Sequence, residues 1–287
     1  MTVPKIGKVG LWSLEMRFGD KALSNAAAEE LEALGYGAVW VPGGIDDGAP
    51  AEVERLLAVT SRMTIATGIL NIWKHEPAQL AAWFGGLPDA AKARTLLGLG
   101  ISHGPLIGEK WGKPLEVTSA FLDGLFAAGM PRDNLCLAAL GPKMVALSGE
   151  RTAGAHPYLV TPEHTAQARA ILGAGPLLAP EQGVILESDP AKARELALGA
   201  LEHYARLPNY RNNWLRLGFS EVEIDSLDER LLDALFAIGN VEKVAHRVQA
   251  HLDAGADHVC LQVIAGRQGG SFDTLLPHWR DLAQALL

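Results

Sequence analysis

Residues 38–70 read AVWVPGGIDDGAPAEVERLLAVTSRMTIATGIL, and this stretch contains the unit from which the fold is predicted. Residues 38–42 form a short apolar run with β-branched side chains, which is typical of a buried strand. Residues 51–60 carry apolar side chains at helical spacing, and residues 63–70 are again strand-like. A strand, a helix and a second strand in this order predict two parallel strands joined by a crossover helix.

The same alternation continues along the whole chain. Strands are predicted at residues 8–16, 38–42, 63–70, 96–102, 134–140, 155–160, 183–187 and 258–264. Eight strands, each followed by a helix, predict an α/β fold, a (β/α)8 TIM barrel. An open doubly wound sheet is the alternative, but no GxGxxG motif follows the first strand.

The chain has 287 residues, which allows one or two domains. The strand count favours a single barrel domain over residues 1–287. Residues 191–240 exceed what a minimal barrel needs and are predicted as a helical excursion over the barrel mouth, before the last strand. A mobile lid and a subunit contact would both fit this excursion.

The composition excludes several classes of protein. Hydrophobic residues make up 48 %, and 25 basic against 33 acidic residues give a net charge of −8, so nucleic acid is not an expected partner. No apolar run reaches the roughly 18 residues of a membrane span. Cys136 and Cys260 lie far apart in apolar runs, which favours buried free thiols and a cytoplasmic location.

Function in a barrel sits where the strands end, at their carboxyl termini and in the loops that follow. No metal site is expected, because a metallohydrolase barrel would place histidines on the first strand and this strand has none. No GxSxG motif and no lysine within a later strand indicate acyl transfer or a Schiff base. The remaining glycines, amides, histidines and aromatic residues suit a planar cofactor. These mouth positions are Trp12, Ser13, Glu15, Gly43, Gly44, Gly68, Asn71, His75, Ser102, His103, Gly141, Lys143, His156, Tyr158, Glu187 and Gln262.

Residues 66–77, ATGILNIWKHEP, are the most informative of these segments. Gly68 within a strand indicates a bulge or a close approach of the backbone, and Asn71 offers a side-chain amide. His75 and, as second choice, His103 fall at the mouth and are the candidate catalytic residues for proton transfer.

Four segments, ALGYGAVWVPGG, ATGILNIWKHEP, LGLGISHGPLIGEKWGKPL and LGPKMVALSGERTAGAHPYLVTPEHT, resemble the luciferase-like monooxygenase superfamily. More narrowly, they resemble its coenzyme F420-dependent oxidoreductases. The resemblance runs from about Lys8 to Ile264, and its motifs are specific in their order and spacing.

The resemblance implies a non-prolyl cis peptide at Gly68-Ile69 that backs the deazaflavin ring, with Asn71 nearby. It also implies cofactor-binding roles for Gly100, Ser102 and Gly104 along the ribityl and phosphate path, for Gly141 and Pro142 near the phosphate, and for His156 and Tyr158 at the end of the sixth strand. One departure concerns the substrate. Sugar-phosphate dehydrogenases of this branch carry a His and a Trp after the second strand, where this chain reads PGGIDDGAP.

Hydride transfer between coenzyme F420 and an unidentified small organic substrate is therefore the first functional hypothesis. An FMN-dependent monooxygenase is the alternative, and a flavin- or deazaflavin-binding relative without turnover is a third. The resemblance also implies a homodimer.

Overall fold

The computed structural model describes residues 2–44, 46–102, 107–108, 112–266 and 269–287. Its strands are β1 (Val9–Trp12), β2 (Ala38–Gly43), β3 (Thr64–Asn71), β4 (Thr95–Gly100), β5 (Leu135–Leu137), β6 (Gly154–Ala155), β7 (Leu177–Leu178), β8 (Glu181–Ile185), β9 (Phe236–Ile238) and β10 (Val259–Val263). Its α-helices are α1 (Glu15–Phe18), α2 (Lys21–Leu34), α3 (Ala49–Val59), α4 (Pro77–Gly86), α5 (Asp89–Lys92), α7 (Pro114–Ala127), α8 (Pro142–Arg151), α9 (Pro162–Leu172), α10 (Pro190–Leu201), α11 (Pro208–Arg216), α12 (Glu221–Ser226), α13 (Glu229–Leu235), α14 (Val241–Asp253) and α15 (Phe272–Leu286). Short 3-10 helices are η1 (Ile72–Lys74), η3 (Arg132–Asn134) and η4 (Tyr204–Arg206).

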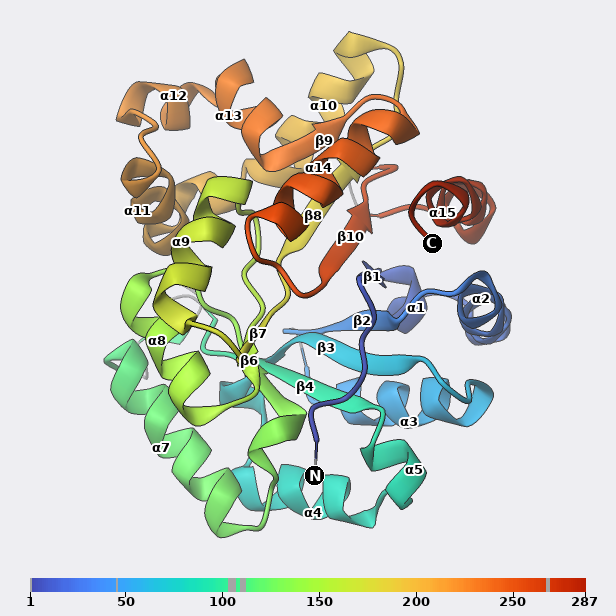
Figure 1. Ribbon diagram of the computed structural model, residues 1–287, viewed down its shortest axis with the longest axis vertical. Helices are drawn as coiled ribbons and strands as arrows, with labels where there is room; N and C mark the ends of the chain where they lie inside the picture. Colours follow the sequence, from blue (N-terminus) through green and yellow to red (C-terminus); the bar gives the residue numbers. More distant parts are fainter. Residues whose placement is uncertain (1, 45, 103–106, 109–111, 267–268) are drawn as a thin grey trace.

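The ten strands form one parallel sheet in the order β7-β6-β5-β4-β3-β2-β1-β10-β8-β9. β7 is the first strand in this order and β8 is the last but one, yet only Ala179 and Pro180 separate them in the chain. The sheet therefore curls round on itself, with the helices along its outside (Figure 1). The parallel α/β architecture predicted from the sequence is confirmed, with ten strands rather than eight.

Alternate residues of the strands belong to two separate apolar clusters. Leu11, Val39 and Ile65 pack in the cluster that also contains residues of the outer helices. The intervening residues Ala38 and Trp40 pack in a second cluster drawn almost entirely from the strands and the segments joined to them. Cys136 and Cys260 belong to this inner cluster and are free and buried, as the sequence predicts.

The first predicted strand, residues 8–16, is too long. β1 ends at Trp12, and α1 begins at Glu15. The Ser13 hydroxyl oxygen accepts hydrogen bonds from the backbone N–H groups of Glu15 and Met16, which starts a helical turn directly after the strand.

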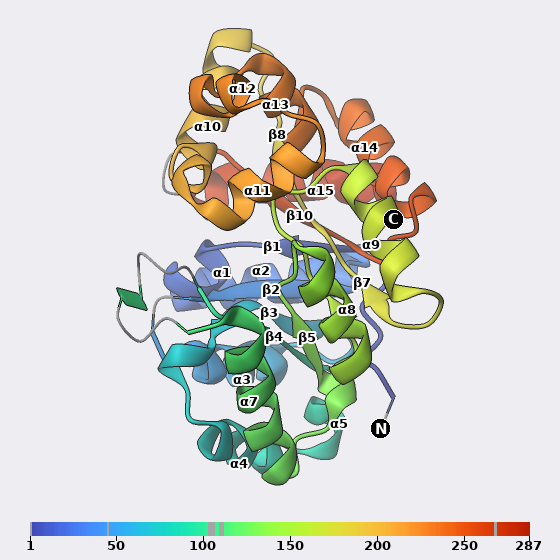
Figure 2. The same ribbon diagram turned by 90° about the vertical axis from the view of Figure 1, so that its left-hand side faces the viewer.

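The segment at residues 191–240 is helical from α10 to α13, and these helices gather at the top of the molecule (Figures 1 and 2). The segment ends in β9, which the sequence analysis did not predict. β9 pairs with β8 and follows α13 without a single intervening residue, so no turn residue marks its start.

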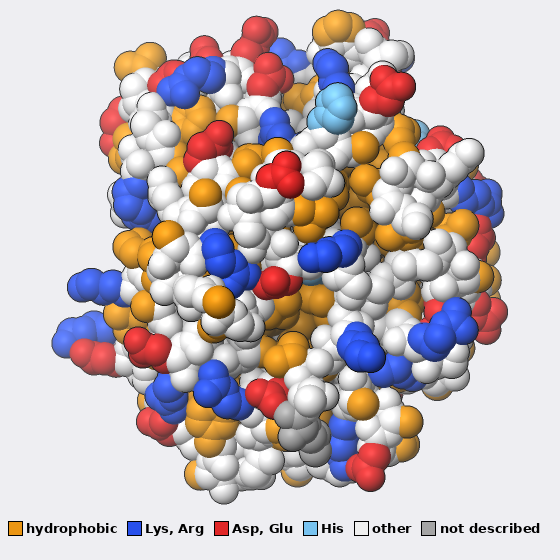
Figure 3. Space-filling view, viewed as in Figure 1, with side chains coloured by type: hydrophobic (Ala, Val, Ile, Leu, Met, Phe, Trp, Pro, Cys, Tyr) orange, Lys and Arg blue, Asp and Glu red, His pale blue; other side chains and the backbone are white. Residues whose placement is uncertain are grey.

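None of the helices in the described ranges is both long and apolar enough to cross a membrane. Lys and Arg side chains are interspersed with Asp and Glu side chains on the face in Figure 3, so the acidic excess does not form one patch there.

Candidate functional site

The end of β3 is irregular at Gly68, as the glycine predicted. The register between β3 and β4 shifts between Thr67 and Leu70, and the Gly68-Ile69 peptide bond is cis, as the family resemblance implies. The indole Nε1 of Trp12 donates a hydrogen bond of 2.7 Å to the carbonyl oxygen of Gly68. Gly68 and Ile69 are half-buried, so this peptide presents backbone at the end of the strand.

Side chains crowd this peptide from two directions. A Cβ atom at Gly68 would lie 2.7 Å from the Trp12 indole and 3.0 Å from Nε2 of His156. A Cβ atom at Gly100 would lie 2.7 Å from the Ile69 side chain. The structure therefore brings together Gly68, Ile69, Gly100 and His156, which the sequence analysis had placed in one site.

His156 lies in a buried stack below Gly68. Its ring is parallel to the indole of Trp40, with 4.1 Å between ring centroids and an interplanar angle of 13°. Nδ1 of His156 lies 2.7 Å from the carbonyl oxygen of Ala179, and since a carbonyl only accepts, Nδ1 carries the proton. Burial lowers the pKa of His156 to about 4. The ring is therefore neutral at pH 7, with Nε2 as an acceptor beside Gly68.

Trp40 continues this stack toward His258. The Trp40 indole donates a hydrogen bond of 3.1 Å to Nε2 of His258, whose Nδ1 lies 3.0 Å from the Gly7 carbonyl oxygen. Burial lowers the pKa of His258 to about 4, so both interior histidines are neutral. The role of these two rings that follows from the contacts is to fix the inner layer on which Gly68 rests.

Tyr158 connects the site with the helical segment. Its hydroxyl donates a hydrogen bond of 2.9 Å to Oε1 of Gln262. Its ring lies 6.4 Å from that of Trp12, 5.4 Å from that of Tyr204 and 6.5 Å from that of Tyr210, centroid to centroid. Tyr204 belongs to η4 and Tyr210 to α11, so the segment predicted as an excursion supplies aromatic side chains to the site.

Glu181, the first residue of β8, is the site residue that sequence reasoning missed. It is 1 % exposed, and its Oε2 accepts a hydrogen bond of 3.1 Å from the backbone N–H of Leu159. Its Oε1 is buried and has no hydrogen-bond partner among the described residues. Burial raises its pKa to about 8. The available signal was an acidic residue inside the apolar run at residues 177–186, LLAPEQGVIL, but the predicted strand began only at Gly183.

Asn71 and His75 lie toward the loop after β2. The Asn71 amide donates a hydrogen bond of 3.3 Å to the carbonyl oxygen of Gly44. Nε2 of His75 is buried and unpartnered among the described residues. Burial lowers the pKa of His75, and the nearby carboxylates of Asp47 and Asp46 oppose that shift. His75 is therefore a proton-transfer candidate separate from the Gly68 cluster in its contacts.

Gly141 and Pro142 begin helix α8. Gly141 is the N-cap residue and no side chain caps this helix terminus. A guanidinium nitrogen of Arg216 lies 3.9 Å from where a Cβ at Gly141 would be, and it donates to Oδ1 of Asn213. An open helix N-terminus beside an arginine suits an anion. Ser102 has a left-handed φ of 62°, and His103 and Gly104 lie outside the described residues.

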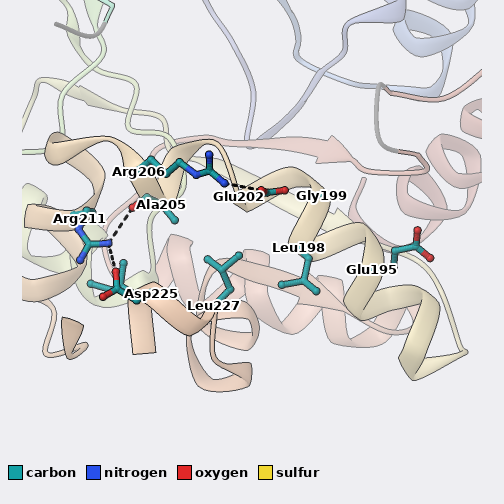
Figure 4. Close-up of a pocket in the computed structure, with 10 residues that line it drawn as sticks. Glu195, Leu198, Gly199, Glu202, Ala205, Arg206, Arg211, Asp225 and Leu227 are labelled. Atoms are coloured by element: carbon teal, nitrogen blue, oxygen red, sulfur yellow. Dashed lines mark hydrogen bonds and ion pairs between the residues drawn. The ribbon is translucent and has the colours of Figure 1, made fainter. Parts of the chain in front are cut away.

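A separate hollow of about 940 Å³ lies within the helical segment (Figure 4). Arg206 and Arg211 border it, but each is already ion-paired, with Glu202 and with Asp225 respectively. None of the sequence-predicted site residues borders this hollow. The described residues also contain no group of three or more His, Cys, Asp or Glu side chains arranged to hold a metal ion.

The sequence profile of the luciferase-like monooxygenase family matches residues 24–127. This segment is luciferase-like. The match covers β2, β3 and β4, and it confirms the resemblance for the part of the chain that contains Gly68. No curated protein sequence matches the chain.

Solved structures extend the likeness of fold to the whole chain. An F420-dependent secondary alcohol dehydrogenase in complex with an F420-acetone adduct is 16 % identical, with a TM-score of 0.71 and 100 % of both chains covered. The coenzyme F420-dependent tetrahydromethanopterin reductase of Methanopyrus kandleri is 12 % identical, with a TM-score of 0.69 and 98 % of both chains covered. The FMN-bound oxygenating constituent of 3,6-diketocamphane monooxygenase from Pseudomonas putida is 15 % identical, with a TM-score of 0.68, covering 98 % of this chain and 99 % of that one.

Proposed function

We propose that the chain is an F420-dependent oxidoreductase that transfers a hydride between coenzyme F420 and a small organic substrate. The observation that carries the proposal is the half-buried Gly68-Ile69 peptide, held by Trp12 and backed by His156 at the end of β3. This feature lies inside the segment that matches the luciferase-like family. A protein of the same fold has F420 in its name and an F420 adduct in its structure.

The residues present fit such a cofactor. The half-buried backbone at Gly68 and Ile69 offers a surface for a planar ring, and Gly100 makes room for Ile69 beneath it. The open N-terminus of α8 beside Arg216 suits a phosphate. When bound, the deazaflavin supplies a carbon atom that accepts or donates a hydride. The protein then has to orient the substrate, exclude water and handle one proton.

The proton-transfer residue proposed from the sequence is His75, with His103 as second choice. His75 has a buried, unpartnered Nε2 and two aspartates nearby, which suits a group that exchanges a proton. We further propose that β7 and β8 act together as the seventh strand of a (β/α)8 barrel, with β9 as an added strand. Two residues separate β7 from β8, and they pair with β6 and β10 respectively.

Equilibrium titration of the purified protein with F420 and, separately, with FMN tests the cofactor. Quenching of cofactor fluorescence gives the two dissociation constants. Binding of F420 at least tenfold tighter than that of FMN is expected. Reduction of bound F420 by a panel of secondary alcohols is then the first activity to measure.

The remaining outcomes discriminate between the alternatives. Tight FMN binding without F420 binding would favour the FMN-dependent monooxygenase. Bound F420 that no hydride donor reduces would favour a binding protein without turnover. Absence of binding by either cofactor contradicts the proposal.

A further inference from the structure

Glu181 is a carboxyl group without the partners that buried acids normally have. Only Oε2 is satisfied, by the N–H of Leu159, and Oε1 faces no donor or acceptor among the described residues. No arginine, lysine or histidine in the described part of the chain forms an ion pair with it. A buried polar atom left unpaired costs free energy, so its retention is explained by a partner that arrives with the ligand.

The groups whose charge would act on Glu181 come from four different elements. They are Tyr158 after β6, Tyr204 in η4, Tyr210 in α11 and Cys260 in β10. Burial raises the pKa of each of them, so all four are neutral at pH 7. A carboxyl group buried among neutral side chains is held in its protonated, uncharged form.

The position of Glu181 is fixed from its other oxygen. Leu159 has a left-handed φ of 53°, which a leucine rarely adopts. Its N–H donates to Glu181, and its carbonyl oxygen accepts a hydrogen bond of 3.2 Å from the Trp214 indole. The backbone after Tyr158 is thus held at both polar groups, and Oε2 cannot swing away without releasing it.

We propose that Glu181 is a catalytic acid of this site, whose unpartnered Oε1 hydrogen-bonds an uncharged carbonyl or hydroxyl oxygen of the substrate and exchanges a proton with it. The assignment rests on the proposed function for the hydride and deepens it by naming the substrate class. An uncharged oxygen is required because the surrounding tyrosine rings and Cys260 offer no countercharge to an anion.

The step assigned to Glu181 is the transfer of one proton. In the reducing direction the O–H bond of Glu181 breaks, and its electron pair stays on Glu181 as a carboxylate. The proton forms a new O–H bond on the substrate oxygen and neutralises the charge left there when a hydride reaches the adjoining carbon. A proton from water then restores the acid, and the oxidising direction runs in reverse.

The first experiment needs no cofactor. Infrared spectroscopy of the ligand-free protein should show the carbonyl band of a protonated carboxyl group at pH 7, which disappears as the pH is raised above about 9. Glu181→Gln should lack the band, and Glu150→Gln, the same change at an exposed position on α8, should retain it. A band that is unchanged in Glu181→Gln, or absent from the wild type, overturns the proposal.

The second experiment separates binding from proton transfer. Binding of cyclohexanone, an uncharged ketone, and of cyclohexanecarboxylate, an anion of similar size, is measured by calorimetry with and without F420. The ketone should bind and the anion should not. Glu181→Gln keeps an N–H donor, so ketone binding should stay within threefold while turnover falls at least a hundredfold. Glu181→Leu should lose both.

The outcomes also separate this proposal from the proposed function. Absence of F420 binding to the wild type removes the proposed function, while the infrared result still decides whether Glu181 is a buried acid. Normal F420 binding with ketone turnover that Glu181→Gln leaves unchanged overturns the role of Glu181 alone. Preference for the anion, or no binding of either probe, overturns the substrate class.

Discussion

The indole of Trp12 and the backbone of Gly68 are joined by a 2.7 Å hydrogen bond, although their strands are not neighbours. β2 lies between β1 and β3 in the sheet, so the bond spans the inner face of the curled sheet. Trp12 also packs against the inner cluster of strand residues. The inside of the sheet therefore determines the position of the peptide that is proposed to support the cofactor.

Substitution of Gly68 by alanine tests this arrangement. The new Cβ would lie 2.7 Å from the Trp12 indole, which cannot move without losing its hydrogen bond to the same residue. We expect a loss of about 1–3 kcal/mol in the free energy of unfolding and at least tenfold weaker F420 binding. Urea denaturation and fluorescence titration measure the two effects.

Gly85→Ala in helix α4 is the matched control, because a Cβ there would meet nothing within 4 Å. Alanine is favoured over glycine in a helix, so this variant should be unchanged or up to about 1 kcal/mol more stable. If Gly68→Ala behaves like Gly85→Ala, the close packing around Gly68 does not govern the site.

The interior histidines predict a loss of stability in acid. Burial lowers the pKa of His258 from 6.5 to about 4, so between these values the unfolded chain binds a proton that the folded chain does not. The free energy of unfolding should therefore fall as the pH falls from about 6.5 to 4, by up to roughly 3 kcal/mol from this residue. His258→Gln retains an acceptor for Trp40 and a donor for Gly7, and it should weaken the dependence. His246→Gln, at an exposed position on α14, should not.

Glu181 predicts a pH dependence of the opposite sign. Its pKa is raised from 4.5 to about 8, so between these values the folded chain keeps a proton that the unfolded chain has lost. Its contribution to stability is complete below pH 4.5 and is lost as the pH rises toward about 8. In Glu181→Gln, the free energy of unfolding should decline less than in the wild type between these pH values. An identical decline in both proteins contradicts burial of the acid.

Much of the fold was predictable because the strands are buried on both faces and the helices have clear boundaries. Gly35 ends α2 in a left-handed conformation, and Thr161 caps α9 before Pro162, as such residues do in isolated helices. β9 was not predictable, because a strand of three residues that directly follows a helix has neither a pattern of its own nor a turn before it.

The site was predictable only where local chemistry marks it. Gly68 breaks a β-branched strand and therefore indicates the bulge. Glu181 lies before the predicted start of its strand, and Arg216 lies near the end of a helix distant in sequence from Gly141. Their importance depends on contacts between segments that are far apart in the chain, which periodicity and spacing do not contain.

His75 is tested by its effect on turnover. Its buried Nε2 has no partner in the described part of the chain, which leaves it available to a substrate. His75→Gln should reduce hydride-transfer turnover by about a hundredfold with F420 affinity changed less than threefold. Turnover is measured by the absorbance of F420 under steady-state conditions. Wild-type turnover in this variant would remove His75 from the mechanism and leave Glu181 as the acid among the described residues.

Arg216 is expected to stabilise the phosphate of the bound cofactor. Its guanidinium lies beside Gly141, where helix α8 begins without a side-chain cap, and the Oδ1 of buried Asn213 accepts a hydrogen bond from it. Arg216→Gln should weaken F420 binding five- to fiftyfold, and the difference from the wild type should shrink at high salt, because exposed charges are screened. Arg206→Gln removes an arginine that is paired with Glu202 at the separate hollow, and its F420 affinity should equal that of the wild type. Equal losses in the two variants would indicate a general effect of net charge, and the phosphate would then have to bind elsewhere than at α8.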